Sequence, residues 1–311
     1  MADILNSIIP IFAVILLGAL LRRIGLLPAI FLGPANQLVY YVAIPVMLFQ
    51  EIARASFARH FNPVMLLATL LPLTLILPLG VPLARRLKLR SERGTFLQTQ
   101  FHGNLGYVGL AVAFYALGDE GLTRASLLIG FMLIWQNIQA IIILSLNQIS
   151  PGSAAKVKTS RAQLLFRMIL THPVIIAVAL GLAFSLAGLK LPLVVDRSLK
   201  IVSGMSLPLA LLLIGASLDI VKFRGRSPLV LVSSFMKLLV SPALGLMLYL
   251  ALRLPPQEYL PGLILLAAPT ASMTYILAKE MHGDQELASN CVSFSTLASV
   301  LSYTVWLAIL K

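Results

Sequence analysis

The sequence predicts an all-α polytopic membrane protein, and its composition and the grouping of its apolar residues lead to that fold class. Of its 311 residues, 59% are hydrophobic and only 11% are charged. Soluble domains are about 45–50% apolar and about 25% charged. The apolar residues also gather into runs of about 20, which is the length that a helix needs to cross a bilayer.

Ten such runs can be delimited, and the connections between them are short. They cover residues 4–21, 35–52, 63–83, 97–117, 124–147, 165–187, 193–218, 228–252, 259–279 and 288–310. The first run lacks a basic n-region, so we expect a retained helix rather than a signal peptide. The longest connection, 148–164, is polar and basic. It divides the chain into two halves of five helices, 1–147 and 165–311.

Basic residues are concentrated in alternate connections of this predicted topology. The odd-numbered connections hold most of the lysines and arginines. Loops rich in Lys and Arg lie in the cytoplasm, which predicts that the linker 148–164 is cytoplasmic and that both termini lie outside. We expect the chain in the plasma (inner) membrane. These loops account for the net charge of +13, so we expect no nucleic-acid partner.

The two halves repeat the same pattern of prolines and glycines. Shifts of 163 to 165 positions align residues of the first half with identical residues of the second: Pro10 with Pro173, Gly18 with Gly181, Pro45 with Pro208, and Pro78 with Pro242. Because each half holds an odd number of helices, the second half must enter the membrane upside down. This predicts two inverted five-helix repeats, an architecture of many secondary transporters. Pro45 and Pro208 are expected to kink their helices.

Two runs, 97–117 and 259–279, are interrupted where a membrane helix should be most apolar. The fourth contains His102, Gly103, Asn104, Gly106 and Gly109 in its first half, and each glycine costs about 1 kcal/mol relative to alanine in a helix. The ninth contains Pro269, which breaks a helix, followed by Thr270. Helix breaks at corresponding positions of two repeats indicate a transport site, so we expect broken, crossing helices four and nine. The alternative is close packing of helices through small residues.

Polar side chains near these breaks favour an anionic substrate. The N-termini of half-helices attract anions. Lys237 lies near the middle of run 228–252, where a lysine is costly and usually functional. It can pair with the substrate anion, occupy the place of a sodium ion, snorkel, or bond to carbonyls near a break. Gln136 either faces the cavity or makes a helix contact. No carboxylate is clearly placed at mid-membrane, which disfavours a cation–proton antiporter.

Signatures of catalysis and of cofactor binding are missing from the sequence. There is no HExxH, GxSxG or P-loop motif, and Cys291 is the single cysteine. A cysteine-based metal cluster and an internal disulfide are therefore excluded. We expect no enzymatic activity, no metal and no cofactor.

Several motifs together resemble the auxin efflux carrier family. They are NQLVYYVAIPVMLF at 36–49, FHGNLGYVGL at 101–110, MSLPLALLLIGASLD at 205–219, AAPTASMTYILAKE at 267–280 and HGDQELASNCVSFSTLASVLS at 282–302. The resemblance covers essentially the whole chain. It implies ten helices in two inverted repeats, a scaffold part and a transport part that move against each other, and a crossing of the fourth and ninth helices at their breaks.

The plant auxin carriers have an Asn-Pro pair at each crossing, and this chain splits that pattern. Asn104 is followed by Leu105, and Pro269 is preceded by Ala268. By resemblance, Asn104 carries over as a substrate contact and Pro269 as the second crossing. The second asparagine does not carry over, and the long hydrophilic loop of the plant carriers is missing. The chain therefore looks more like the short prokaryotic members, which are described as permeases of malate or other organic anions.

These inferences predict a secondary active transporter of small organic anions, such as carboxylates or auxin-like acids, working by alternating access. The expected substrate-binding residues are Asn104, Gly103, Gly106, Pro269, Thr270, Lys237 and Gln136. A sodium-coupled carrier of the bile-acid type and a membrane sensor that does not transport are the alternatives. The expected partners are the anion and the lipid bilayer, and a homodimer is left open.

Overall fold

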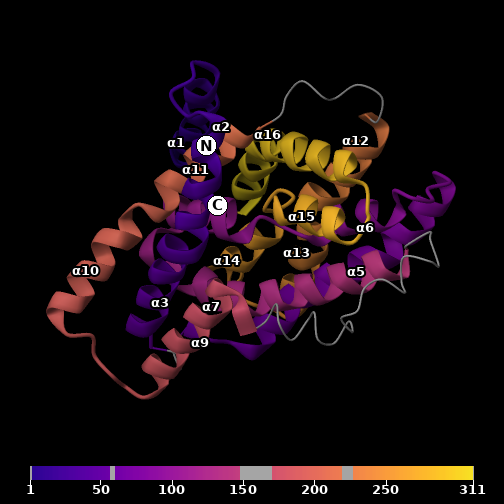
Figure 1. Cartoon of the computed structure of the whole chain (residues 1–311). Coiled ribbons are helices and arrows are strands. Elements are labelled where there is room, and N and C mark those ends of the chain that lie inside the picture. The colour runs from indigo at the N-terminus through magenta and orange to yellow at the C-terminus, as the bar shows by residue number, and fades with distance from the viewer. Residues whose placement is uncertain (1, 57–59, 148–169, 219–226, 311) are drawn as a thin grey trace.

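The structure is a computed structural model that describes residues 2–56, 60–147, 170–218 and 227–310 (Figure 1). Within these ranges every regular element is helical, and two chain segments form an isolated β-bridge. The predicted linker 148–164 lies outside the described residues. The helices, including three π-turns labelled η, are α1 (Ala2–Arg23), α2 (Ala29–Leu38), η1 (Val39–Ala43), α3 (Ile44–Arg54), α5 (Pro63–Arg86), α6 (Arg93–Phe101), η2 (Leu105–Gly109), α7 (Leu110–Leu146), α9 (Pro173–Leu186), α10 (Leu193–Gly204), α11 (Ser206–Ser217), α12 (Ser227–Phe235), η4 (Met236–Val240), α13 (Ser241–Ala251), α14 (Pro256–Leu266), α15 (Met273–Glu280) and α16 (Gln285–Leu310).

Seven helical stretches in the described ranges are long and apolar enough to cross a membrane. The chain is therefore a polytopic, all-helical membrane protein. The ten predicted runs are not all counted separately. The stretch Leu105–Leu146 takes in most of the fourth run and the fifth, which meet at a kink at Gly118 (φ 71°), and the ninth run is divided between α14 and α15. Of the sixth run, the helix Pro173–Leu186 is described. The ten-helix repeat stays a prediction.

The helices form two lobes, each built from one segment of either half of the chain (Figure 1). Lobe A contains α1, α2, η1, α3, α9, α10 and α11, and its closest pairs are α1 with α11 and α3 with α9. Lobe B contains α5, α6, η2, α7 and the elements from α12 to α16, with α5 packed on α13 and α7 packed on α14. Helix α7 also contacts α1, α3 and α9, so it joins the lobes.

Prolines explain where the α-helices change geometry. Pro45 and Pro242 each occupy the second position of a helix that directly follows a π-turn, η1 and η4. A proline lacks the N–H for the helical hydrogen bond and its ring clashes with the preceding turn, and a π-turn accommodates such an interruption. Pro208 lies in the first turn of α11, just after Met205, where the helix is interrupted between α10 and α11. The kinks predicted at Pro45 and Pro208 are thus a π-turn and a helix break.

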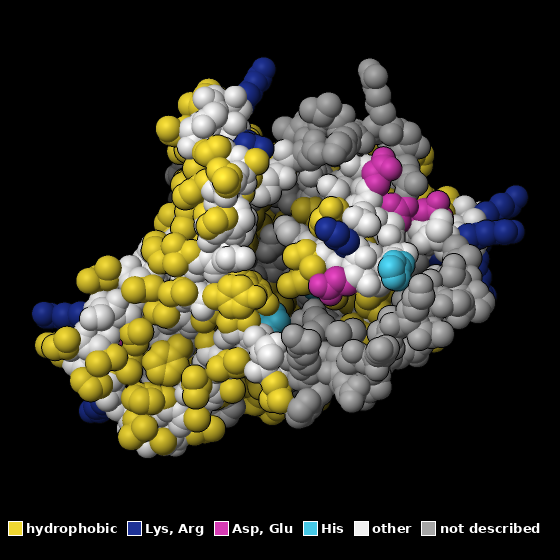
Figure 2. Space-filling model, viewed as in Figure 1, with side chains coloured by type: hydrophobic (Ala, Val, Ile, Leu, Met, Phe, Trp, Pro, Cys, Tyr) yellow, Lys and Arg dark blue, Asp and Glu magenta, His cyan; other side chains and the backbone are white. Residues whose placement is uncertain are grey.

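Apolar side chains cover much of the outer surface, as expected for a chain in contact with lipid (Figure 2). Helix α10 has no buried residue, and Val194 and Ile201 on it are 77% and 80% exposed. Such large exposed apolar side chains are rare in contiguous patches on soluble monomers. Lobe A therefore presents a surface suited to hydrocarbon rather than water.

Candidate functional site

The first helix break lies where the sequence predicts it, at Asn104. Helix α6 ends at Phe101 and η2 begins at Leu105. The backbone of Asn104 is not helical, with φ −77° and ψ 71°, and its Oδ1 accepts a hydrogen bond from the N–H of Tyr107 at 3.3 Å. Asparagine is a favoured N-cap because its side chain replaces a missing helical partner. Asn104 therefore starts the second half-helix.

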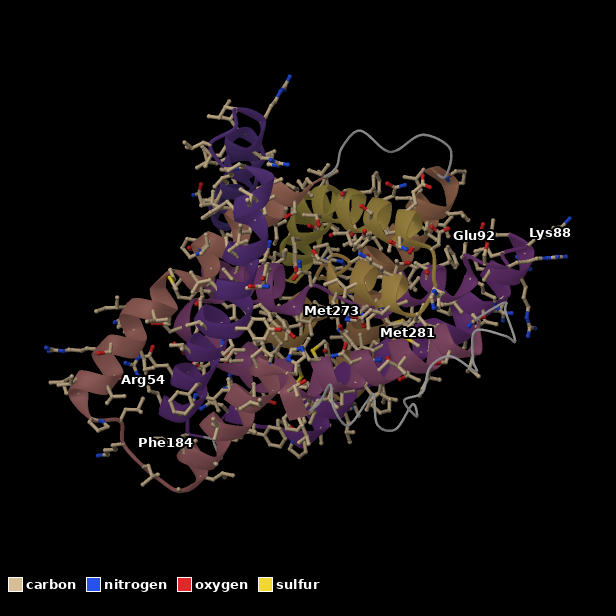
Figure 3. The ribbon with its side chains drawn as sticks, in the orientation of Figure 1. Arg54, Lys88, Glu92, Phe184, Met273 and Met281 are labelled. Atoms are coloured by element: carbon tan, nitrogen blue, oxygen red, sulfur yellow. The ribbon has the colours of Figure 1, made fainter. Side chains whose placement is uncertain are left out.

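The second break surrounds Pro269. Helix α14 ends at Leu266 and α15 begins at Met273. The N–H of Thr274 donates to the carbonyl of Ala271 at 2.9 Å, which forms the first turn after the break. Figure 3 labels Met273 near the centre of the view. Asn104 is 9% exposed and Thr270 is 0% exposed, so both interruptions are enclosed by protein, where non-helical backbone in a membrane protein is tolerated.

The two breaks cross and are paired by backbone atoms. Gly103 and Thr270 form an antiparallel β-bridge. The N–H of Asn104 donates to the carbonyl of Pro269 at 2.7 Å, and the N–H of Ala271 donates to that of His102 at 2.9 Å. Each break thus satisfies polar groups that the other leaves without helical partners. We call residues 102–104 and 269–271 the crossing.

Thr270 is enclosed and connected to two neighbouring helices. Its side chain is 0% exposed, and its Oγ1 donates to the carbonyl of Thr99 at 3.1 Å. Its N–H donates to Oγ of Ser295 at 3.0 Å, and Thr99 is bonded in turn to Ser233. In this conformation the Thr270 hydroxyl holds α6 against the second break.

Lys237 reaches the crossing from η4 and is 0% exposed. Its Nζ donates to the carbonyl of Leu266, the last residue of α14, at 2.7 Å. A Cβ on Gly103 would lie 3.1 Å from this Nζ, so a larger residue at that position would require the end of the Lys237 side chain to shift. Of the roles considered for Lys237, bonding to a carbonyl at a break is present in the structure. In the described part of the chain no carboxylate forms an ion pair with it.

Gln136 and Gly106 complete the predicted set. The Oε1 of Gln136 accepts the N–H of Gly103 at 3.2 Å. Its Nε2 is buried and has no hydrogen-bond partner. Gly106 lies in η2, one turn beyond the crossing, and is partly exposed. The structure therefore brings all seven predicted residues to the crossing or its next turn, although their roles stay predictions.

Other polar groups at the crossing were not predicted as site residues. Thr99, Ser233 and Ser295 bond to Thr270 or to each other. His102 is 1% exposed, and its Nδ1 accepts a hydrogen bond from Nε2 of Gln98 at 3.3 Å. The available signal was the density of Ser, Thr and Gln in α6 and α16, which is unusual for membrane helices.

Tyr107 connects the crossing to lobe A. Its N–H is bonded to Asn104, and its hydroxyl lies 3.5 Å from Oδ1 of Asn36 on α2. Within the described ranges no group of three or more His, Cys, Asp or Glu side chains could hold a metal ion. The crossing therefore offers amides, hydroxyls, carbonyls and one ammonium for recognition.

Comparison with known proteins identifies the family. The family model described as "Membrane transport protein" matches residues 3–307. The chain belongs to this family. The resemblance to auxin efflux carriers is thereby confirmed at the level of the family, and this membrane transport protein is similar to three curated relatives over essentially its whole length.

The three relatives share about a quarter of their residues with this chain. The chain is 25% identical to the "Putative malonate transporter" of Rhizobium meliloti, over 100% of this chain and 97% of the relative. It is also 25% identical to an uncharacterized transporter of Methanothermobacter thermautotrophicus, over 98% of each chain. Another uncharacterized transporter, from Methanocaldococcus jannaschii, is 23% identical over 97% of each chain. The family and these names are those of transporters.

Proposed function

We propose that this protein is a secondary transporter of small organic anions that binds its substrate at the crossing. The observation that carries this proposal is the meeting of two half-helix N-termini, those of η2 and α15, beside the buried ammonium of Lys237. The first N–H groups of a helix have no partner in that helix, and they carry partial positive charge. The site thus combines several donors for a carboxylate.

Asn104 and Gly106 are the proposed first contacts. Asn104 is 9% exposed, and its Oδ1 is already bonded to Tyr107. Its amide Nδ2 is therefore the group left to donate to a substrate oxygen. Thr270, Gln136 and Pro269 are more enclosed. We propose that they fix the shape of the crossing and that the substrate does not contact them first.

Reciprocal contacts support the inverted repeat that alternating access needs. The shift of 163 residues converts the α1–α11 pair into the α9–α3 pair, and these are the two closest helix pairs. A Cβ on Gly18 would overlap the backbone of Leu212, and a Cβ on Gly181 would lie 3.2 Å from the carbonyl oxygen of Phe49. The same shift relates Gly18 to Gly181 and Phe49 to Leu212. Two lobes that each mix both halves can move against each other around the crossing.

The substrate class rests on the site and on one relative. The name of the Rhizobium meliloti protein refers to malonate, a dicarboxylate. Because the amine of Lys237 already occupies the crossing and donates to the carbonyl of Leu266, we propose that no sodium ion binds there. This separates the proposal from a sodium-coupled carrier of the bile-acid type.

Thermal unfolding of the purified protein with malonate, malate and indole-3-acetate, each with and without sodium, tests the substrate class. A ligand that binds only the folded state raises the melting temperature. We expect stabilisation by at least one carboxylate without sodium. Stabilisation that requires sodium contradicts the assignment of Lys237. Flux of the stabilising anion into liposomes separates a carrier from a sensor, which would bind without transporting.

Asn104→Asp tests the site with little change in shape. An aspartate still accepts the N–H of Tyr107, so the cap is kept, but it loses the amide donor and adds a charge that repels a carboxylate. We expect at least about a tenfold loss of anion affinity, the equivalent of about 1.4 kcal/mol. Asn147→Asp, on the same lobe at the end of α7, is the matched control and should bind normally. Unchanged affinity in folded Asn104→Asp would remove Asn104 from the site.

A further inference from the structure

Lys237 carries a buried amine that has no carboxylate partner among the described residues. Its side chain is 0% exposed. Among the described residues, its Nζ donates a hydrogen bond to the carbonyl of Leu266, and none of the ion pairs includes it. A charge in a protein interior is costly unless it is paired. Something other than a fixed carboxylate must therefore accompany the protonated amine.

The substrate anion of the proposed function is suited to be that partner. The Nζ lies 3.1 Å from the position of a Cβ on Gly103, and Gly103 directly precedes Asn104. Charges interact more strongly inside a protein than in water. An anion held by Asn104 would therefore stabilise a proton on Lys237 without needing to touch it.

We propose that Lys237 is the proton carrier of the transport cycle, which makes the protein an anion–proton symporter. This inference rests on the proposed function. The empty carrier holds a neutral amine; one proton from water joins it as the anion binds, and both leave on the other side. A monocarboxylate then crosses without net charge, and a dicarboxylate dianion carries one negative charge. The Leu266 carbonyl accepts an N–H from either form of the amine.

The elements packed around η4 bring other titratable groups, and one of them faces Lys237. His102, at the end of α6, directly precedes Gly103, beside which the Nζ of Lys237 lies. The remaining groups are phenols and a thiol enclosed in the same lobe, and charged side chains in the terminal turns of helices: Tyr249 on α13, Tyr259 and Glu258 on α14, Cys291, Tyr303 and Glu286 on α16, Arg85 and Arg86 on α5, and Arg93 on α6. Tyr249 and Tyr303 are bonded to Thr69 and to the carbonyl of Ile264. His102 is therefore the competing candidate.

Calorimetry of the wild-type protein tests the inference directly. Binding of malonate and of indole-3-acetate is measured in two buffers of different ionisation enthalpy, so that the difference in heat reports protons taken up. We expect uptake of about one proton per anion bound, and an affinity that falls as pH rises. Anion binding with no proton uptake would overturn the symport while leaving the proposed function intact. Failure of every carboxylate to bind would overturn both.

Variants then assign the proton. Lys237→Met should weaken anion binding about tenfold or more because the positive charge is lost, whereas Lys279→Met, the same change on exposed Lys279 of α15, should behave as wild type. Lys237→Arg keeps the charge but cannot release its proton, so it should bind the anion without proton uptake. Folding of each variant is checked by thermal unfolding.

His102→Gln distinguishes the two candidates and does not depend on altering Lys237. A glutamine can still bond to Gln98, so the helix end is kept. We expect proton uptake on anion binding to persist in this variant. Its loss would assign the proton to His102 and overturn the inference, as would proton uptake that persists in folded Lys237→Met or Lys237→Arg.

Discussion

The two lobes bury different kinds of side chain. In the described part of lobe A the buried polar side chains are Gln50, His172 and Ser206, whereas lobe B buries many, above all along α6 and α16. Lobe A is instead held by close contact of backbones: a Cβ on Gly215 of α11 would overlap the carbonyl of Ile15. Small residues at helix contacts are a common means of packing in membranes.

This difference indicates that lobe A serves mainly for helix packing, whereas lobe B also holds the groups proposed to recognise the substrate. In a membrane, buried polar side chains are retained mainly where they bond to each other, to a broken backbone or to a substrate. Lobe B holds both breaks and the bonds around them, such as that of Thr270 to Thr99. We therefore expect substitutions in lobe A to change stability, and substitutions around the crossing to change transport as well.

The largest loss of stability is expected where α1 and α11 of lobe A are in direct backbone contact. Gly215→Ala places a Cβ against the carbonyl of Ile15 and 3.0 Å from the N of Ala19, so α1 and α11 must separate. We expect a loss of about 2–3 kcal/mol in the free energy of unfolding, measured by thermal unfolding in detergent. Gly204→Ala, in the same lobe with nothing within 4 Å, is the control. Equal stability of the two variants would contradict backbone packing as the basis of lobe A.

A smaller loss of stability, with a loss of transport, is expected in lobe B. Thr270→Val keeps the shape but leaves the carbonyl of Thr99 without its donor, which costs about 1–2 kcal/mol. Transport should fall because the crossing is less well held. The control Thr304→Val removes a hydroxyl that bonds within its own helix, to Val300, and should cost less than about 0.5 kcal/mol. Wild-type transport by Thr270→Val would show that its hydroxyl is only structural.

The smallest effect on stability is expected between the lobes. The hydroxyl of Tyr107 lies 3.5 Å from Oδ1 of Asn36, at the limit of a hydrogen bond. Tyr107→Phe should cost less than about 0.5 kcal/mol. If the two lobes move against each other as proposed, turnover in liposomes should change roughly twofold through a shift of populations.

A buried tyrosine within lobe B provides the control for that prediction. Tyr249 bonds to Oγ1 of Thr69 at 2.9 Å and is fully enclosed. Tyr249→Phe should cost about 1 kcal/mol without changing turnover. If both substitutions altered turnover alike, the division into two lobes would not describe the motion.

Sequence reasoning located the helix breaks because their causes are local. Asn104 among glycines and Pro269 within an apolar run both disfavour a continuous helix, and α6 and α14 end just before them. Proline alone does not decide, because α5 continues through Pro72, Pro78 and Pro82. The family and the class of membrane protein followed from motifs and composition. The ten-helix count, the orientation and the linker 148–164 stay predictions.

The partners of the site residues could not be predicted, because they come from distant parts of the chain. Lys237 was recognised as important from its depth, but its acceptor, the carbonyl of Leu266, becomes available only because α14 ends there. Thr99 lies 171 positions from Thr270. The π-turns were missed as well: a proline predicts an interruption, while the choice between a kink, a break and a π-turn depends on packing.

The pairing of Gly103 with Thr270 also bears on how such a protein can diversify. The two hydrogen bonds at the crossing use backbone atoms, and Pro269 contributes its carbonyl, for which no N–H is needed. Asn104, in contrast, contributes its N–H, so a proline could not replace it without losing a bond. Side chains add bonds around this pair, such as that of Thr270 to Thr99, but the backbone pair itself does not depend on them. Substrate specificity can therefore change through substitution of side chains at the crossing while its backbone pairing is retained.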